Sequence, residues 1–118
     1  MLYLIDKDGV RSRVNRKLFA QAMPEEVLKC ATELDTVCTE PSEGAHLLVV
    51  VNVEGLDAST VKEWMEAMNR RHVAWSWFAF LSRNESIPDW LPALRPTGIL
   101  CEPLDMHVLK QAFALALI

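Results

Sequence analysis

Apolar runs bounded by turn-forming residues recur along the whole chain. Runs of about four to eight apolar residues are typical of strands that are covered on both faces of a sheet. The two strongest runs, at 46–52 and 73–81, are rich in β-branched or aromatic residues, so we expect them at the sheet centre. Strands are predicted at 1–5, 27–31, 46–52, 73–81 and 98–101.

The segments between these runs show helical periodicity. Apolar residues recur every three or four positions from Val10 to Ala22, and Pro24 ends that helix. A short helix is expected at 33–39, before the turn-rich stretch at 40–44. The first two strands are therefore each followed by a helix.

Helices are also expected after the later strands. Asp57 or Ser59 can cap the third helix, because both side chains accept hydrogen bonds from free backbone N–H groups. At 85–94 we expect a short or distorted helix, since Pro92 removes a backbone donor. A final helix is predicted at 104–118, and its apolar residues exceed what one buried stripe needs.

Strands that alternate with helices indicate a parallel sheet with helices on both faces. A chain of 118 residues suits one such domain with one core. No internal repeat or linker divides it, and at this length a stable core requires neither a disulfide nor a metal. The sequence therefore predicts a single α/β domain.

The distribution of charged residues restricts the kinds of molecule that the domain is expected to bind. The formal net charge is −4, which argues against a broad nucleic-acid surface, because neutralising phosphates requires clustered Lys and Arg. The one dense basic stretch, at 11–17, is expected on a solvated helix face. No run of about 18 apolar residues is present, so no membrane span is predicted.

The cysteines and histidines do not have the spacing of a metal site. Cys30, Cys38 and Cys101 do not cluster, and three thiols in a chain without a secretion signal favour a reducing cytoplasm. We expect these cysteines to be small core residues. The three histidines belong to different elements, so we predict neither a bound metal nor a cofactor.

Polar residues stand at the ends of several predicted strands. In open α/β sheets, ligands bind outside the carboxyl ends of the strands. Those ends carry Asp6, Asn52, Ser82 and Glu102. The sequence therefore predicts one polar cluster that is assembled from four separate segments.

Four segments together resemble the receiver domains of response regulators. They are Ile-Asp-Lys-Asp at 5–8, Val-Asn-Val-Glu-Gly at 51–55, Leu-Ser-Arg-Asn at 81–84 and Gly-Ile-Leu-Cys-Glu-Pro at 98–103. The resemblance implies a flavodoxin-like, three-layer (βα)5 fold with a doubly wound, five-stranded parallel sheet of strand order 2-1-3-4-5. It also implies that residues 1–118 are the N-terminal domain of a longer signalling or transcription-regulatory protein.

In the resembled family, an acidic pair and an aspartate at the end of the third strand hold Mg²⁺. That aspartate accepts the phosphoryl group, while a hydroxyl residue and a lysine engage it, and a proline follows the lysine. The matching positions in this chain are Asp6, Lys7, Asn52, Ser82, Glu102 and Pro103.

Three of these positions depart from the family pattern in ways that oppose phosphotransfer. Asn52 is an amide, which is a far poorer nucleophile than a carboxylate. Lys7 replaces one acid of the pair, and Mg²⁺ requires several anionic oxygens. Glu102 replaces the lysine and repels an incoming phosphoryl group. The sequence therefore predicts a pseudo-receiver that is not an enzyme and holds no metal.

Several alternatives stay open at this point. Asp8 is a candidate second acid if the turn shifts by one residue, whereas Glu54 lies too far along the strand end to replace the acceptor. Lys7 and Glu102 are either an ion pair across the cleft or two unrelated solvated charges. An ordinary phosphorylatable receiver requires that Asn52 does not occupy the acceptor position.

The leading functional hypothesis is a regulatory module that acts in signal transduction through protein–protein interaction. In the resembled family, the face made by the fourth helix, fifth strand and fifth helix mediates dimerisation and docking. We therefore expect a protein partner, a homodimer or an output domain of the same chain to bind there, and no direct contact with nucleic acid. The candidate interface residues are Trp90, Leu109 and Phe113.

The alternative hypothesis is a small-molecule sensor that uses the cleft vacated by the lost phosphorylation chemistry. Asp6, Asn52, Ser82 and Arg83 supply donors and acceptors there. Such a set suffices to orient a small polar or anionic ligand.

Overall fold

The computed structural model of the chain describes residues 1–41, 46–72, 74–83 and 85–116. Its strands are β1 (Leu2–Ile5), β2 (Leu28–Ala31), β3 (Leu47–Asn52), β4 (Trp75–Leu81) and β5 (Gly98–Cys101). Its helices are α1 (Gly9–Ala22), α2 (Leu34–Cys38), α3 (Ala58–Arg71), the 3-10 helix η1 (Pro92–Leu94) and α4 (Met106–Ala116).

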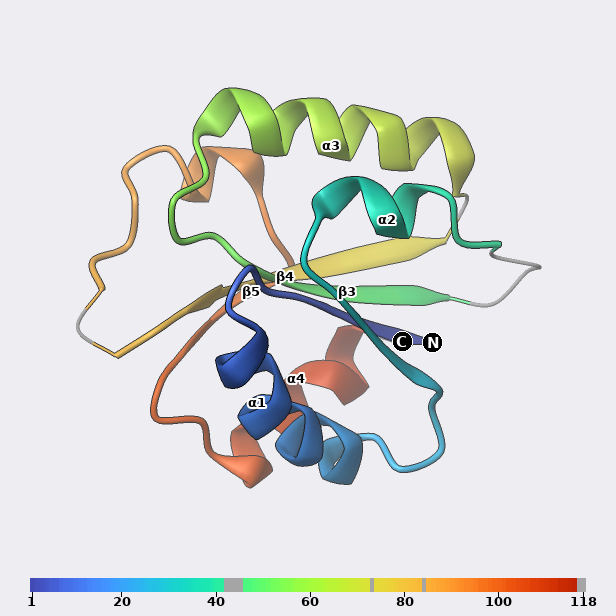
Figure 1. Cartoon of the computed structure of the whole chain (residues 1–118), viewed down its shortest axis with the longest axis vertical. Helices are drawn as coiled ribbons and strands as arrows, with labels where there is room; N and C mark the ends of the chain where they lie inside the picture. Colours follow the sequence, from blue (N-terminus) through green and yellow to red (C-terminus); the bar gives the residue numbers. More distant parts are fainter. Residues whose placement is uncertain (42–45, 73, 84, 117–118) are drawn as a thin grey trace.

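The strands form one parallel sheet in the order β2-β1-β3-β4-β5. Helices α1 and α4 cover one face, while α2, α3 and η1 lie on the other (Figure 1). Both predictions, the three-layer architecture and the strand order 2-1-3-4-5, are confirmed. Every residue of β1 and β3 is buried, as the continuous apolar runs indicate.

Each face of the sheet has its own apolar core. Alternate residues of a strand point to opposite faces, so neighbouring residues such as Val49 and Val50 contribute to different clusters. On the α3 side, the Trp64 ring packs edge-on against Trp75 and Trp77, with centroids 5.4 and 5.7 Å apart. Both tryptophans of β4 meet α3 because two residues along a strand share a face. Trp77 is buried, and Trp75 is half-buried.

Capping residues set the ends of the helices. The Asp8 side chain accepts from the N–H groups of Val10 and Arg11, and this begins α1. Asp57, rather than Ser59, caps α3 by accepting from Thr60. The predicted helix at 85–94 is reduced to the single 3-10 turn of η1, in agreement with the proline content of this segment.

Two predicted interface residues are core residues. Leu109 and Phe113 are each 1% exposed and belong to the cluster between α1, α4 and the sheet. The Phe113 ring packs at a tilt against Phe19 and edge-on against Phe78. Trp90 is half-buried against the opposite cluster, beside α3. The sequence prediction was therefore wrong about Leu109 and Phe113, because it counted the apolar surplus of the helix and did not use the positions of its polar residues.

The cysteine prediction was wrong for two of the three residues. Cys30 and Cys101 are exposed, and Cys38 is buried. The exposed pair lies on β2 and β5, the two edge strands, which receive less cover from the helices. Within the described residues, no helix has the length and apolar content required to span a bilayer.

Candidate functional site

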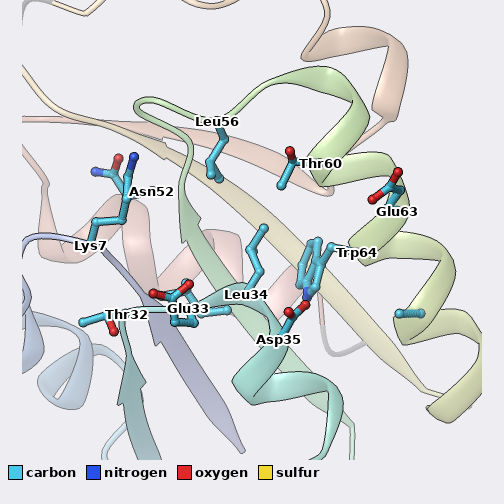
Figure 2. Close-up of a pocket in the computed structure, with 12 residues that line it drawn as sticks. Lys7, Thr32, Glu33, Leu34, Asp35, Asn52, Leu56, Thr60, Glu63 and Trp64 are labelled. Carbon is cyan, nitrogen blue, oxygen red and sulfur yellow. The ribbon is translucent and has the colours of Figure 1, made fainter.

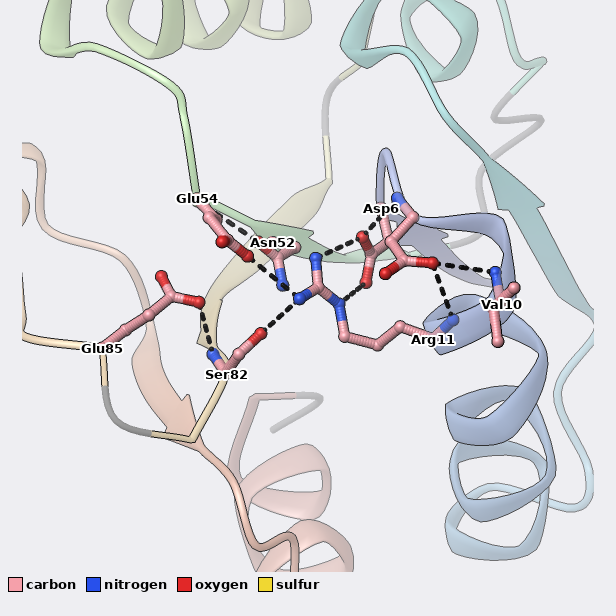
Figure 3. A network of polar contacts seen from close by, with 8 residues as sticks. Asp6, Val10, Arg11, Asn52, Glu54, Ser82 and Glu85 are labelled. Carbon is pink, nitrogen blue, oxygen red and sulfur yellow. Dashed lines mark hydrogen bonds and ion pairs between the residues drawn. The ribbon is translucent and has the colours of Figure 1, made fainter.

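The carboxyl ends of β1, β3 and β4 bring four polar side chains together at one edge of the sheet. Asp6 follows β1, Asn52 ends β3, Glu54 lies two residues further along, and Ser82 follows β4. These four side chains surround the guanidinium of Arg11, which enters from α1 (Figure 3). Three of the four residues of the predicted polar cluster thus meet here, Glu54 stands in place of Glu102, and the Arg11 guanidinium lies at the centre.

Asp6 is the principal partner of this guanidinium. Arg11 Nε donates to Asp6 Oδ2 at 2.8 Å, and Nη2 donates to Oδ1 at 2.9 Å. Two parallel bonds of this kind are the strongest arrangement between Arg and a carboxylate. The Asp6 side chain is 1% exposed and that of Arg11 is 20% exposed, so the pair lies largely out of water.

A third nitrogen of the guanidinium links two further segments. Arg11 Nη1 donates to Glu54 Oε2 at 3.0 Å and to the Ser82 hydroxyl oxygen. The hydrogen bonds to Asp6 and Glu54 raise the pKa of Arg11 above its ordinary value, against the opposing effect of burial. The arginine is therefore a cation throughout the pH range in which proteins fold. We call the set Asp6, Arg11, Glu54 and Ser82 the arginine clamp.

Local backbone geometry brings Arg11 to this position. Side chains on an α-helix lean toward its N-terminus. Because Asp8 begins α1 directly above the strand ends, a residue in the first turn leans back over them. The N–H of Asp8 also donates to Asp6 Oδ1 at 2.9 Å, which holds the β1–α1 turn against the same carboxylate.

Asn52 is oriented by its own neighbour. Its Oδ1 accepts from the Glu54 N–H at 2.9 Å, and this fixes which end of the amide is nitrogen. Asn52 Nδ2 is buried and has no hydrogen-bond partner among the described residues. Asn52 thus lies at the end of β3, as the sequence analysis predicted, and its side chain is a neutral amide.

Lys7 and Glu102 do not form the ion pair that was one of the sequence alternatives. Glu102 borders a hollow with Val14 and Pro103, and Lys7 lies over Gly55 and borders a different cavity. Within the described residues neither side chain takes part in an ion pair. The two charges are therefore separate, as the other alternative had it.

The residues present do not fit the Mg²⁺ ion that the receiver fold implies. Both oxygens of Asp6 already accept from Arg11, and the second position of the acidic pair is Lys7. Asp8 does not replace it, because its Oδ1 accepts the two capping bonds of α1. Across the described part of the chain, no group of three His, Cys, Asp or Glu residues is arranged to hold a metal ion.

The cleft that the small-molecule hypothesis required is occupied by the protein itself. The guanidinium contacts Asp6 and Ser82, two of the four residues assigned to ligand binding, and Arg83 is exposed. The sequence prediction was wrong to treat this cleft as vacant. It missed Arg11 because the basic stretch 11–17 by itself predicts a solvated helix face. The position of Arg11 in the first turn after Asp6 was the available signal.

Comparisons with known proteins agree with the architecture. No family model and no curated protein matches the chain. Among solved structures, a protein assigned to pilus assembly (cpaE) from Burkholderia thailandensis E264 is similar, with a TM-score of 0.70 and 17% identity over 98% of this chain and 95% of that one. A CheY-like response regulator receiver domain protein from Methanospirillum hungatei JF-1 has a TM-score of 0.70 and 12% identity over 98% and 92%. The chain has the CheY-like, flavodoxin-like fold.

Proposed function

We propose that this chain is a receiver-like regulatory domain that works without phosphorylation, through contacts with another protein. Its fold is that of a solved response regulator receiver domain. This supports a role in signal transduction within the cytoplasm, as a module whose output is carried by a partner or by another domain of the same protein.

The arginine clamp is the observation that carries this proposal. In a phosphorylatable receiver, the edge of the sheet must admit a metal ion and a phosphoryl group. Here the Arg11 guanidinium lies in the middle of that edge and is bound on three sides by Asp6, Glu54 and Ser82. The amide of Asn52 supplies no carboxylate to form the acyl phosphate. A guanidinium held by the protein thus occupies the space that a metal ion and a phosphoryl group require.

The outer surface of α1 is the docking surface that the charge distribution favours. This helix carries the cations Arg11, Arg13, Arg16 and Lys17 and no acidic residue. The chain as a whole has a net charge of −4, so the charge of α1 opposes that of the remainder. Val10 and Val14, one turn apart on α1, are 72% and 70% exposed. A protein segment that combines carboxylates with apolar side chains complements this surface.

This surface differs from the face expected from the sequence. Since Leu109 and Phe113 are buried, the last helix retains Val108 and Leu115 as its large exposed apolar residues. Trp90 packs on the other side of the sheet. We propose that α4 borders the docking surface of α1, because both helices cover the same face (Figure 1).

Incubation with acetyl phosphate and Mg²⁺, followed by intact-mass measurement, tests the proposal. Neither the wild type nor Asn52→Asp should gain the mass of a phosphoryl group, because Arg11 still holds Asp6 in both. A receiver domain with an intact acceptor aspartate is the positive control. A saturable, Mg²⁺-dependent gain of one phosphoryl group by the wild type would overturn the proposal.

A further inference from the structure

β2 and β5 are the outer strands of the sheet, and their free edges are protected to different degrees. An uncovered edge carries unpaired backbone groups, and proteins commonly place a charged residue there to prevent pairing with another chain. On β2 this residue is Lys29, which is exposed. Beyond β2, Thr32 and Glu33 lead into α2 and line a cavity beside α3 (Figure 2). β5 has the sequence Gly-Ile-Leu-Cys and no charged residue, so its edge is the one open to pairing.

The ladder to β4 shows which backbone groups of β5 are free. The N–H of Thr97 donates to the Trp77 carbonyl at 2.8 Å, so the backbone groups of Thr97 face β4. These groups point alternately to the two sides of a strand, so those of Ile99 also face β4 and those of Gly98 and Leu100 point outward. Among the described residues, no backbone group outside the sheet bonds to Gly98 or Leu100. Each therefore presents a free donor and a free acceptor.

Apolar side chains flank this edge on both faces of the sheet. Ile99 is half-buried against the α3-side core. On the α4 side, Val108 is 54% exposed and borders a hollow that runs along β5 beside Leu104. A chain that extends the sheet at this edge would therefore cover apolar surface in addition to pairing backbone groups.

The charges at the two ends of β5 have opposite signs. Arg95 precedes the strand and is exposed, whereas Glu102 and Asp105 follow it. None of the three belongs to an ion pair among the described residues. An antiparallel neighbour with the same sequence sets the basic start of one strand beside the acidic end of the other. A parallel neighbour in register sets like charges together, so the charges complement an antiparallel second copy.

We propose that β5 pairs with β5 of a second copy of this chain, antiparallel and around a twofold axis at Ile99, so that the two sheets become continuous. In this register Gly98 of each copy faces Leu100 of the other, and the outward groups of both residues are hydrogen-bonded. Ile99 faces its counterpart across the axis. A twofold contact closes on itself and therefore ends at a dimer. This contact uses the backbone of the strand, unlike the helix contacts expected from the sequence.

Sedimentation equilibrium of the wild-type chain over a concentration series tests the inference. The contact is small, and contacts below about 1,200 Å² are typical of weak complexes. We therefore expect a reversible equilibrium between monomer and dimer, without larger species. A chain that stays monomeric up to about 1 mM, the weak end of specific affinities, would overturn the inference. Open-ended oligomers would overturn it as well, because a twofold contact cannot produce them.

A disulfide reports the register of the two strands. Opposed residues whose backbone groups point away from each other have Cα atoms about 4.5 Å apart, a distance that a disulfide spans. Ile99→Cys, in a chain that also carries Cys30→Ser and Cys101→Ser, should therefore form a covalent dimer on mild oxidation. The wild type should not crosslink through Cys101, because its counterpart lies about 14 Å away in this register. The opposite pattern of crosslinking would overturn the register.

Charge reversal tests the direction of the pairing. Arg95→Glu sets an anion beside the acidic end of the second copy and should weaken dimerisation about tenfold. Lys62→Glu makes the same change at an exposed position of α3 and is the matched control, which should dimerise like the wild type. Equal dissociation constants for the two variants would overturn the antiparallel pairing.

Thermal unfolding checks that each variant is folded. The dimer goes beyond the proposed function and does not depend on it. None of these results bears on the phosphorylation assay, so failure here is distinguishable from failure of the proposed function.

Discussion

Replacing Arg11 by Ala should destabilise the domain by about 2–3 kcal/mol. The change leaves the carboxylate of Asp6, 1% exposed, with a single bond from the Asp8 N–H. Removing one partner of a fully buried ion pair costs about 3–5 kcal/mol. The Arg11 side chain is 20% exposed, so water that enters its place solvates Asp6 in part. We therefore expect a cost of about 2–3 kcal/mol, below the range for a fully buried pair.

Lysine at this position should recover only part of the loss. An ammonium keeps the charge, but it cannot make two parallel bonds to Asp6 and also reach Glu54 and Ser82. We therefore expect Arg11→Lys to cost roughly half as much as Arg11→Ala. In a double-mutant cycle, Asp6→Ala combined with Arg11→Ala should cost clearly less than the sum of the two single changes.

Urea unfolding followed by tryptophan fluorescence measures these differences, because Trp64 and Trp77 are buried. For a domain of this size, 2–3 kcal/mol corresponds to a fall in Tm of roughly 10 °C. Arg13→Ala is the matched control, since Arg13 lies on the same helix, is exposed and forms no ion pair within the described residues. If Arg11→Ala changed the unfolding free energy by less than about 0.5 kcal/mol, as exposed substitutions do, the clamp would be energetically irrelevant.

Three further predictions follow from packing and protonation. An Ellman titration of the native protein should show two fast thiols, Cys30 and Cys101, and one slow thiol, because burial raises the pKa of Cys38 and hides its sulfur; three equal rates would contradict this. The bond from the Thr60 N–H lowers the pKa of Asp57, so the stability it contributes is complete above about pH 4, the unfolded value, and is lost as pH falls through the lower folded value. Asp57→Ala should therefore unfold more easily than wild type in urea at neutral pH, and the difference should shrink as the pH falls below about 4. Trp90→Ala should lower the unfolding free energy by about 2 kcal/mol, because Trp90 is half-buried against the α3-side core; unchanged thermal stability with weakened self-association in sedimentation would instead support the interface role expected from the sequence.

The architecture was predictable because the apolar runs and the helical segments between them both indicate a parallel sheet covered by helices. The continuous apolar runs at 46–52 and 73–81 have no solvent face, so they require a sheet covered by helices on both sides. The predicted strand at 98–101 and the observed β5 have the same bounds. The direction of the last helix had a signal that the sequence prediction did not use, because His107, Lys110 and Gln111 recur at helical spacing and mark its solvent side.

The site was predictable in its positions and not in its contacts. Asp6, Asn52 and Ser82 meet at one edge because parallel strands end together. The charge at that edge comes from the Arg11 side chain, which extends over the strand ends from α1. The pattern of hydrophobic and polar residues does not predict how far a single side chain extends. The ion pair considered between Lys7 and Glu102 is a second example of a contact that the sequence does not determine. Two substituted positions in one site need not lie within contact of each other.

The arginine clamp also makes one side chain a tether between a helix and three loops that follow different strands. Arg11 belongs to α1, and its bonds end on the segments after β1, β3 and β4. Hydrogen bonds weaken steeply when donor and acceptor separate by much more than about 3 Å. We therefore expect a displacement of α1 by about 1 Å relative to the sheet to weaken the bonds from Arg11 to Glu54 and Ser82. In the proposed function, a partner that shifts α1 would act through these bonds on the loops at the strand ends, with no chemical modification in between.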